Sequence, residues 1–139
     1  MALLVVVLLA VSGCGGGTQP VAMSLRDASS AVASARLALE SSQESHVFPT
    51  VATVMVDEAL TQLSGAQTQL SAFEPATDRD SRTLESAAAA LAQADAAVRS
   101  TRDSLAGFKG SPSPRKSLDE ITDAERLLDA AAKQAGPPR

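Results

Sequence analysis

The amino-acid sequence predicts an all-α protein, an antiparallel up-down bundle of three long helices followed by a shorter fourth. Apolar residues recur at alternating steps of three and four along four segments, and this spacing keeps one apolar seam on one face of a helix. No segment shows a sustained period of two, which would indicate a half-buried strand. Hydrophobic residues make up 45% of the chain but aromatic residues only 2%. A core of Ala, Leu and Val suits closely spaced helices better than a β-sandwich or barrel.

The first two helices are expected over residues 21–44 and 50–73. Their seams comprise Val21, Leu25, Ala28, Val32, Ala35 and Leu39, and then Ala52, Val56, Ala59, Leu63, Ala66, Leu70 and Phe73. Pro49 suits the first turn of the second helix, where a missing N–H costs nothing. Each helix would be roughly 36 Å long at 1.5 Å per residue.

The third helix is expected over residues 78–107, and the shorter fourth ends near residue 135. Their seams comprise Leu84, Ala87, Leu91, Ala94, Val98, Thr101, Leu105 and Phe108, and then Ile121, Ala124, Leu128, Ala131 and Ala135, flanked by Leu118 and Leu127. Thr77 and Ser117 are each followed three residues later by an acidic residue, which resembles a capping box at the start of a helix.

Residues 108–116 are expected to form the longest linker. Gly107 and Gly110 end the third helix, and two prolines follow within residues 111–114. Ser113 and Lys116 match the bare S-x-x-K pattern, but its companion motifs S-D-N and K-T-G are missing. We therefore interpret these residues as a solvated linker, and residues 136–139 as a C-terminal tail.

Short connections make neighbouring helices antiparallel and favour a bundle within one chain. The alternative is a parallel coiled coil built from several chains. Two features disfavour that alternative: loops interrupt each seam within about four heptads, and alanine occupies many seam positions.

The N-terminus contains an apolar run over residues 2–11, half of the roughly 20 residues that a membrane-spanning helix needs. Small residues follow, and Val11, Ser12 and Gly13 precede Cys14, the only cysteine. A short apolar block ending in small residues is typical of a secretion signal. No Lys or Arg precedes the block, which indicates that the natural start lies upstream.

The sequence Val11-Ser12-Gly13-Cys14 resembles the lipobox of bacterial lipoprotein precursors, and the Ala-rich body resembles small lipoproteins of high-GC Gram-positive bacteria. The resemblance implies that residues 1–13 are removed and that Cys14 carries a diacylglyceryl group. Residues 14–20 would then be a flexible tether, and residues 21–135 a bundle held at the outer face of the cell membrane.

Charge limits the range of partners. The chain has 12 basic and 16 acidic residues, a formal net charge of −4. An acidic surface argues against nucleic acid, because phosphate binding needs a basic patch. It also argues against helices lying flat on anionic lipid, so contact with the membrane is expected only through the anchor at Cys14.

No catalytic or metal-binding set emerges from the sequence, and we expect neither enzymatic activity nor a cofactor. His46 is the only histidine, and a general base or metal ligand needs partners. The acidic pairs near residues 78–80 and 119–120 suit the positive ends of helix dipoles. Strict up-down order instead predicts a partner-contact cluster at the end far from the tether: His46, Phe48, Phe108 and Lys109.

These observations predict a non-enzymatic module that presents a helical surface to an envelope protein or to cell-wall material. The alternative is a carrier or accessory binding protein that holds an apolar small molecule between its helices. The thin seams and the placement of aromatic residues at helix ends favour the first hypothesis, because binding pockets are usually lined by large apolar groups.

Overall fold

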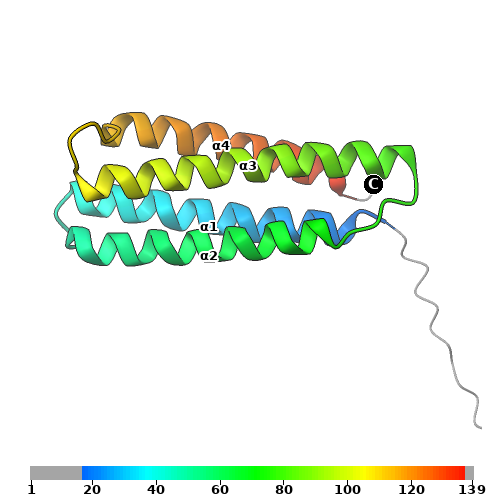
Figure 1. Cartoon of the computed structure of the whole chain (residues 1–139), viewed down its shortest axis with the longest axis horizontal. Coiled ribbons are helices and arrows are strands. Elements are labelled where there is room, and N and C mark those ends of the chain that lie inside the picture. Colours follow the sequence, from blue (N-terminus) through cyan, green and yellow to red (C-terminus); the bar gives the residue numbers. More distant parts are fainter. Residues whose placement is uncertain (1–16, 137–139) are drawn as a thin grey trace, which may run out of the picture.

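The computed structural model describes residues 17–136, which form four helices (Figure 1). They are α1 (Gln19–Gln43), α2 (Pro49–Ser71), α3 (Asp78–Ala106) and α4 (Pro114–Ala135). The all-α prediction is confirmed. The predicted signal at 1–13, the lipobox residues Val11, Ser12 and Gly13, and Cys14 all lie outside the described residues.

The helices run alternately up and down (Figure 1). The Thr18 hydroxyl, just before α1, donates a hydrogen bond to the carbonyl oxygen of Ala135 at the end of α4 (2.6 Å). Further along α1, Arg36 Nη1 donates to Glu125 Oε2 (2.7 Å). As residue numbers rise along α1, the numbers of the α4 residues in contact fall. The two helices are therefore antiparallel. The turn after α1 and the loop after α3 consequently share one end of the bundle, here called the distal end. The start of α1, the α2–α3 turn and the end of α4 share the other, the proximal end.

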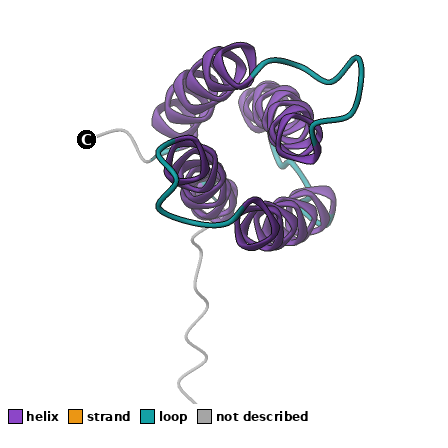
Figure 2. Cartoon of the chain, turned by 90° about the vertical axis from the view of Figure 1, so that its left-hand side faces the viewer, coloured by secondary structure: helices purple, strands orange, loops and turns teal. Residues whose placement is uncertain are grey.

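The core contains most of the predicted seam residues and is made mainly of Ala, Leu and Val. Phe73, Leu84 and Leu105 are only partly buried against it, and Phe108 is exposed. Seen end-on, the helices surround one common interior (Figure 2). α1 and α3 also pack against each other across the diagonal, whereas α2 and α4 do not meet. Small side chains permit this close diagonal approach, since the separation of helix axes depends on the side chains at the contact. Five further alanines are buried on the two diagonal helices: Ala22, Ala31, Ala38, Ala90 and Ala97.

Three helix starts follow the expected chemistry. The Thr77 side chain caps α3 by accepting a hydrogen bond from the Asp80 N–H (3.1 Å). Pro49 opens α2, and Pro20 lies in the first turn of α1. α1 begins at Gln19, so the last two residues of the predicted 14–20 tether belong to the helix.

The start of α4 corrects two expectations. Ser113 caps the helix by accepting a hydrogen bond from the Lys116 N–H (3.2 Å), and Pro114 occupies the first turn. Residues 114–116 therefore belong to α4 and not to the predicted 108–116 linker, since proline at the first helical position is favourable. With 22 residues, α4 is still the shortest helix, one residue shorter than α2. Ser117 is buried instead of capping, and its hydroxyl donates to the Ser100 carbonyl oxygen (3.2 Å).

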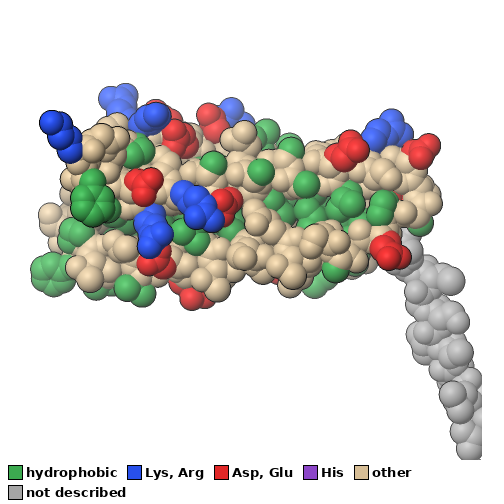
Figure 3. Space-filling model, in the orientation of Figure 1, with side chains coloured by type: hydrophobic (Ala, Val, Ile, Leu, Met, Phe, Trp, Pro, Cys, Tyr) green, Lys and Arg blue, Asp and Glu red, His purple; other side chains and the backbone are tan. Residues whose placement is uncertain are grey.

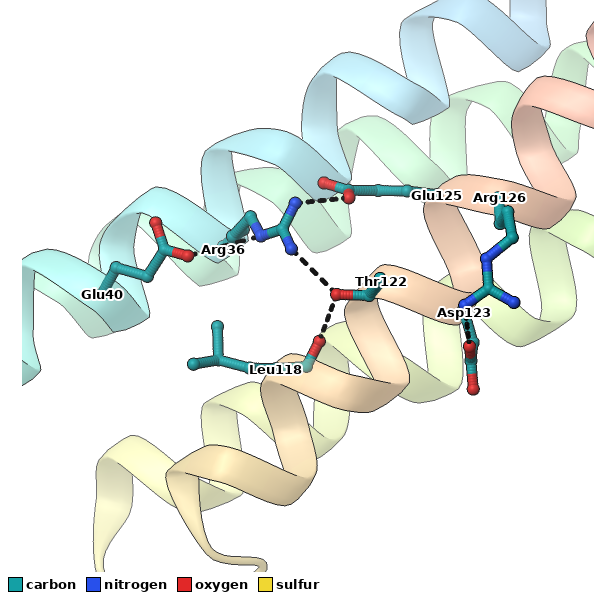
Figure 4. A network of polar contacts seen from close by, with 7 residues as sticks. All are labelled: Arg36, Glu40, Leu118, Thr122, Asp123, Glu125 and Arg126. Atoms are coloured by element: carbon teal, nitrogen blue, oxygen red, sulfur yellow. Dashed lines mark hydrogen bonds and ion pairs between the residues drawn. The ribbon is translucent and has the colours of Figure 1, made fainter.

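A polar network crosses the α1–α4 interface (Figure 4). In addition to its contact with Glu125, Arg36 donates from Nη2 to the Thr122 hydroxyl (2.8 Å), which itself donates to the Leu118 carbonyl oxygen. Arg36 Nε lies at ion-pair distance from Glu40 (3.4 Å) without forming a hydrogen bond. The network fixes α4 along α1 at mid-bundle.

Candidate functional site

The α1–α2 turn presents Phe48 to solvent. Ser45 adopts a left-handed conformation (φ 60°), and the His46 N–H bonds back to the Ser41 carbonyl oxygen (2.9 Å). Phe48 is extended (φ −67°, ψ 144°), the conformation that a following proline favours. Successive side chains of extended backbone point to opposite sides. Accordingly, Val47 packs against the core while Phe48 is 80% exposed.

The α3–α4 loop presents Phe108 in a comparable way. Gly107 ends α3 with φ 67°, a left-handed conformation that glycine adopts without strain. The Ser111 N–H then donates to the Phe108 carbonyl oxygen (2.9 Å) and closes a turn in which Gly110 has φ 94°. Phe108 is 75% exposed, although the sequence predicted it as the last residue of the third seam.

Two more apolar side chains, Val51 and Val54, are exposed in the first turns of α2, which packs beside α3. Arg102 of α3 forms an ion pair with Asp57 of α2 (2.9 Å). Val51 lies six residues from Asp57 toward the distal end, about 9 Å along α2. α3 ends at Ala106, four residues beyond Arg102, and Phe108 follows in the loop. Phe48, Val51, Val54 and Phe108 are together called the distal patch. Figure 3 shows exposed hydrophobic side chains at this end, on the left.

The structure brings the four predicted contact residues His46, Phe48, Phe108 and Lys109 to the distal end, all of them exposed. His46 Nδ1 lies 3.1 Å from a carboxylate oxygen of Glu44. Sequence reasoning missed Val51 and Val54. Their signal was present, because both are apolar residues that fall outside the seam of their helix.

Basic side chains accompany the distal patch. Residues 106–118 contain Lys109, Arg115 and Lys116 and no acidic residue. Lys116 lies 3.9 Å from Glu120, whereas Lys109 and Arg115 form no ion pair with any residue of 17–136. The α3–α4 loop and the first turn of α4 therefore carry positive charge, with carboxylates on either side at Asp103 and at Asp119 and Glu120.

Two apolar grooves lie at the proximal end, one on each side of the last turns of α2. The α2–α3 groove has a volume of about 310 Å³ and is lined by Leu70, Leu84 and Leu91, among others. The α1–α2 groove, of about 250 Å³, lies between the same Leu70 and Phe73 on one side and Met23 on the other. These volumes are near the lower limit of small-molecule sites, about 300 Å³.

A third groove, between α3 and α4, is polar. It has a volume of about 310 Å³ and is lined by Gln93, Glu120 and Asp123 over a floor that includes Ala97. Asp123 is already paired with Arg126 (2.7 Å). Nearby on α3, hydrogen bonds and the negative charge of Asp95 raise the pKa of Arg99 above its ordinary value.

Within residues 17–136, no three or more His, Cys, Asp or Glu side chains lie close enough together to hold a metal ion. Among the helices described, none combines the length and hydropathy needed to cross a membrane. Comparison of the chain with protein-family models, with curated proteins and with solved structures gives no match.

Proposed function

We propose that this chain is a lipid-anchored, non-enzymatic module of the bacterial cell envelope that uses its distal patch to bind a protein partner. The single observation that carries the proposal is the exposure of Phe48 and Phe108 at the end of the bundle opposite to the start of α1. Of the three phenylalanines, only Phe73 packs against the core. Aromatic side chains are frequent anchors of protein interfaces, where they dominate the binding energy.

The anchor rests on the lipobox sequence and on chain length. Cys14 precedes Gly17, the first described residue, by three residues, a reach of at most about 10 Å. Two acyl chains on Cys14, each methylene contributing about 0.8 kcal/mol on burial, would hold the protein stably at a bilayer. The proximal end would then lie near the lipid, and the distal patch would face away from it.

The anchor is tested by replacing Cys14. Mass spectrometry of the native protein is expected to find a chain that begins at an acylated Cys14. The Cys14→Ala variant is expected to lack the acyl mass and to keep residues 1–13, whereas Ser12→Ala, which retains a small residue, is expected to be processed. Native protein with an unmodified thiol and an intact N-terminus would contradict the proposal.

The partner is tested by photo-crosslinking in cells. A photoreactive amino acid is placed at position 48 or 108, and at position 23 as a control, because Met23 is an exposed apolar residue at the proximal end. Discrete protein adducts are expected from positions 48 and 108 and are not expected from position 23. The same adducts at all three positions, or none at 48 and 108, would contradict the proposal.

A second function is favoured by the two proximal grooves: a carrier for an apolar small molecule. Leu70 lines both grooves, so a ligand in either one would contact the last turns of α2. Organic extraction of the purified protein followed by mass spectrometry tests this function. A stoichiometric lipid or quinone supports the carrier, and Leu70→Gln should then lower its content. Protein that yields none excludes it.

A further inference from the structure

We infer that the partner segment that contacts the distal patch is acidic as well as apolar. The inference rests on the proposed function, since it assigns a chemistry to the partner of the same surface. The carrying observation is that Lys109 lies beside Phe108 in the α3–α4 loop and Arg115 lies in the first turn of α4. Neither forms an ion pair with any of the described residues.

The charge of the α3–α4 loop and of the first turn of α4 opposes that of the whole chain. The formal net charge of the chain is −4. The α3–α4 loop and the first turn of α4 nevertheless contain only basic charged residues, and the facing segment 44–56 contains one carboxylate, Glu44, which lies beside His46. Figure 3 shows basic side chains at the extreme left of the upper helices. A complementary partner would therefore place carboxylates against Lys109 and Arg115.

The shape of the patch favours a protein segment over a bilayer. Val51 and Val54 continue from Phe48 along the first turns of α2, so the patch extends from the end of the bundle onto its side. A flat bilayer surface would not contact both parts at once. The bilayer that holds Cys14 would also lie beyond the proximal end, and α2 alone, with 23 residues, separates the two ends by about 35 Å.

Charge and apolar contact would have separable effects. Exposed charges act mainly by steering association, and salt screens them over about 10 Å at 0.1 M ionic strength. An aromatic side chain buried at the centre of an interface mainly slows dissociation. Lys109 and Arg115 should therefore govern the salt dependence of binding, and Phe108 should govern the lifetime of the complex.

The test uses the full-length chain in phosphatidylcholine nanodiscs and a fluorescent amphipathic helical peptide of Glu and Leu, about 14 residues or four turns long. Fluorescence polarisation measures binding, with empty nanodiscs as blank and the same peptide carrying Lys in place of Glu as control. The Glu peptide is expected to bind at least about tenfold more tightly than the Lys peptide, with the difference shrinking as salt rises from about 0.05 M to about 0.3 M.

Matched variants assign the effect to the patch. Phe108→Ser is expected to weaken binding of the Glu peptide at least about tenfold, whereas Leu127→Ser, at an exposed apolar position on α4, leaves it unchanged. Lys109→Glu is expected to weaken binding and reduce its salt dependence. Arg126→Glu, which alters the net charge equally, is expected to have little effect because Arg126 lies about 18 Å along α4 from its distal start at Pro114.

The outcomes separate this inference from the proposed function. Equal binding of the two peptides, or binding that Phe108→Ser leaves intact, overturns the acidic partner. So does attachment of the nanodisc-held protein to phosphatidylglycerol vesicles without binding to the Glu peptide, since that result makes the ligand an anionic bilayer. In each of these cases, protein adducts at positions 48 and 108 would still support the proposed function. The absence of such adducts would contradict both the proposed function and the acidic partner.

Discussion

Arg36 of α1 and Glu125 of α4 form the shortest ion pair between two helices of residues 17–136, with 2.7 Å between Nη1 and Oε2. Their side chains are 35% and 26% exposed, so water screens the pair less than a fully exposed one. The same guanidinium also donates to Thr122. Arg36 is therefore the main polar link between the first and last helices.

The Arg36–Glu125 pair should contribute measurably to stability. A double-mutant cycle with Arg36→Ala and Glu125→Ala, measured by urea unfolding, is expected to give a coupling free energy of about 1 kcal/mol. The control cycle is Arg126 with Asp123, which lie on one helix and are 74% and 67% exposed. That cycle should give at most about 0.5 kcal/mol. Equal coupling in both cycles would show that the contact between helices adds nothing.

The alanine core should not tolerate larger side chains. Ala94 is completely buried on α3, and the Ala94→Leu variant is expected to lower the free energy of unfolding by about 1–3 kcal/mol because the added volume forces helices apart. Ala92 is exposed on the same helix, so Ala92→Leu should change it by at most about 0.5 kcal/mol. Thermal unfolding followed by circular dichroism compares the two, and a milder effect at Ala94 would contradict the packing described.

The cap at Ser113 predicts where α4 loses stability. Ser113→Ala removes the acceptor for the Lys116 N–H and is expected to cost about 1 kcal/mol of unfolding free energy. Ser111→Ala, two residues earlier and outside the helix, should have little effect. Hydrogen exchange of the Lys116 amide should be faster in Ser113→Ala alone. Unchanged protection would place the start of the helix elsewhere.

The three phenylalanines should differ in what they contribute to folding. Phe48→Ser and Phe108→Ser are each expected to change the unfolding free energy by at most about 0.5 kcal/mol, since neither side chain is buried. Phe73→Ser should cost roughly 1–2 kcal/mol because Phe73 packs partly against the core. Urea unfolding of the three variants provides the comparison. A large loss at position 48 or 108 would mean that the residue supports the fold and is not available as a contact surface.

The seams were predictable because each depends only on spacing within one helix. The width of the buried face of each helix could not be predicted, because it depends on which helices pack against each other. Ala31 and Ala97 fall outside the predicted stripes, yet both are buried, on helices that pack against each other across the diagonal. The pattern of a single helix carries no information about that diagonal contact.

The start of α4 shows a second limit. Local sequence favours a cap at Ser117, because Glu120 completes its motif, and indicates a linker at Ser113. Packing between helices determines which serine caps α4, since the Ser117 hydroxyl donates its hydrogen bond to the Ser100 carbonyl oxygen of α3. At the candidate site, up-down order was enough to place Phe48 and Phe108 at one end, whereas the turn that exposes Phe108 depends on backbone conformation at Gly107 and Gly110.

The hydrogen bond from Thr18 to Ala135 has a topological consequence. Because the helical region begins and ends side by side, a short connection could join residues 18 and 135 while the chain is opened within 44–48, and adjacent termini are the condition under which such circular permutation succeeds. The permuted bundle would keep every helix contact but receive its tether at the opposite end. Whether the distal or the proximal end faces away from the membrane thus depends on the position of the chain termini and not on how the helices pack.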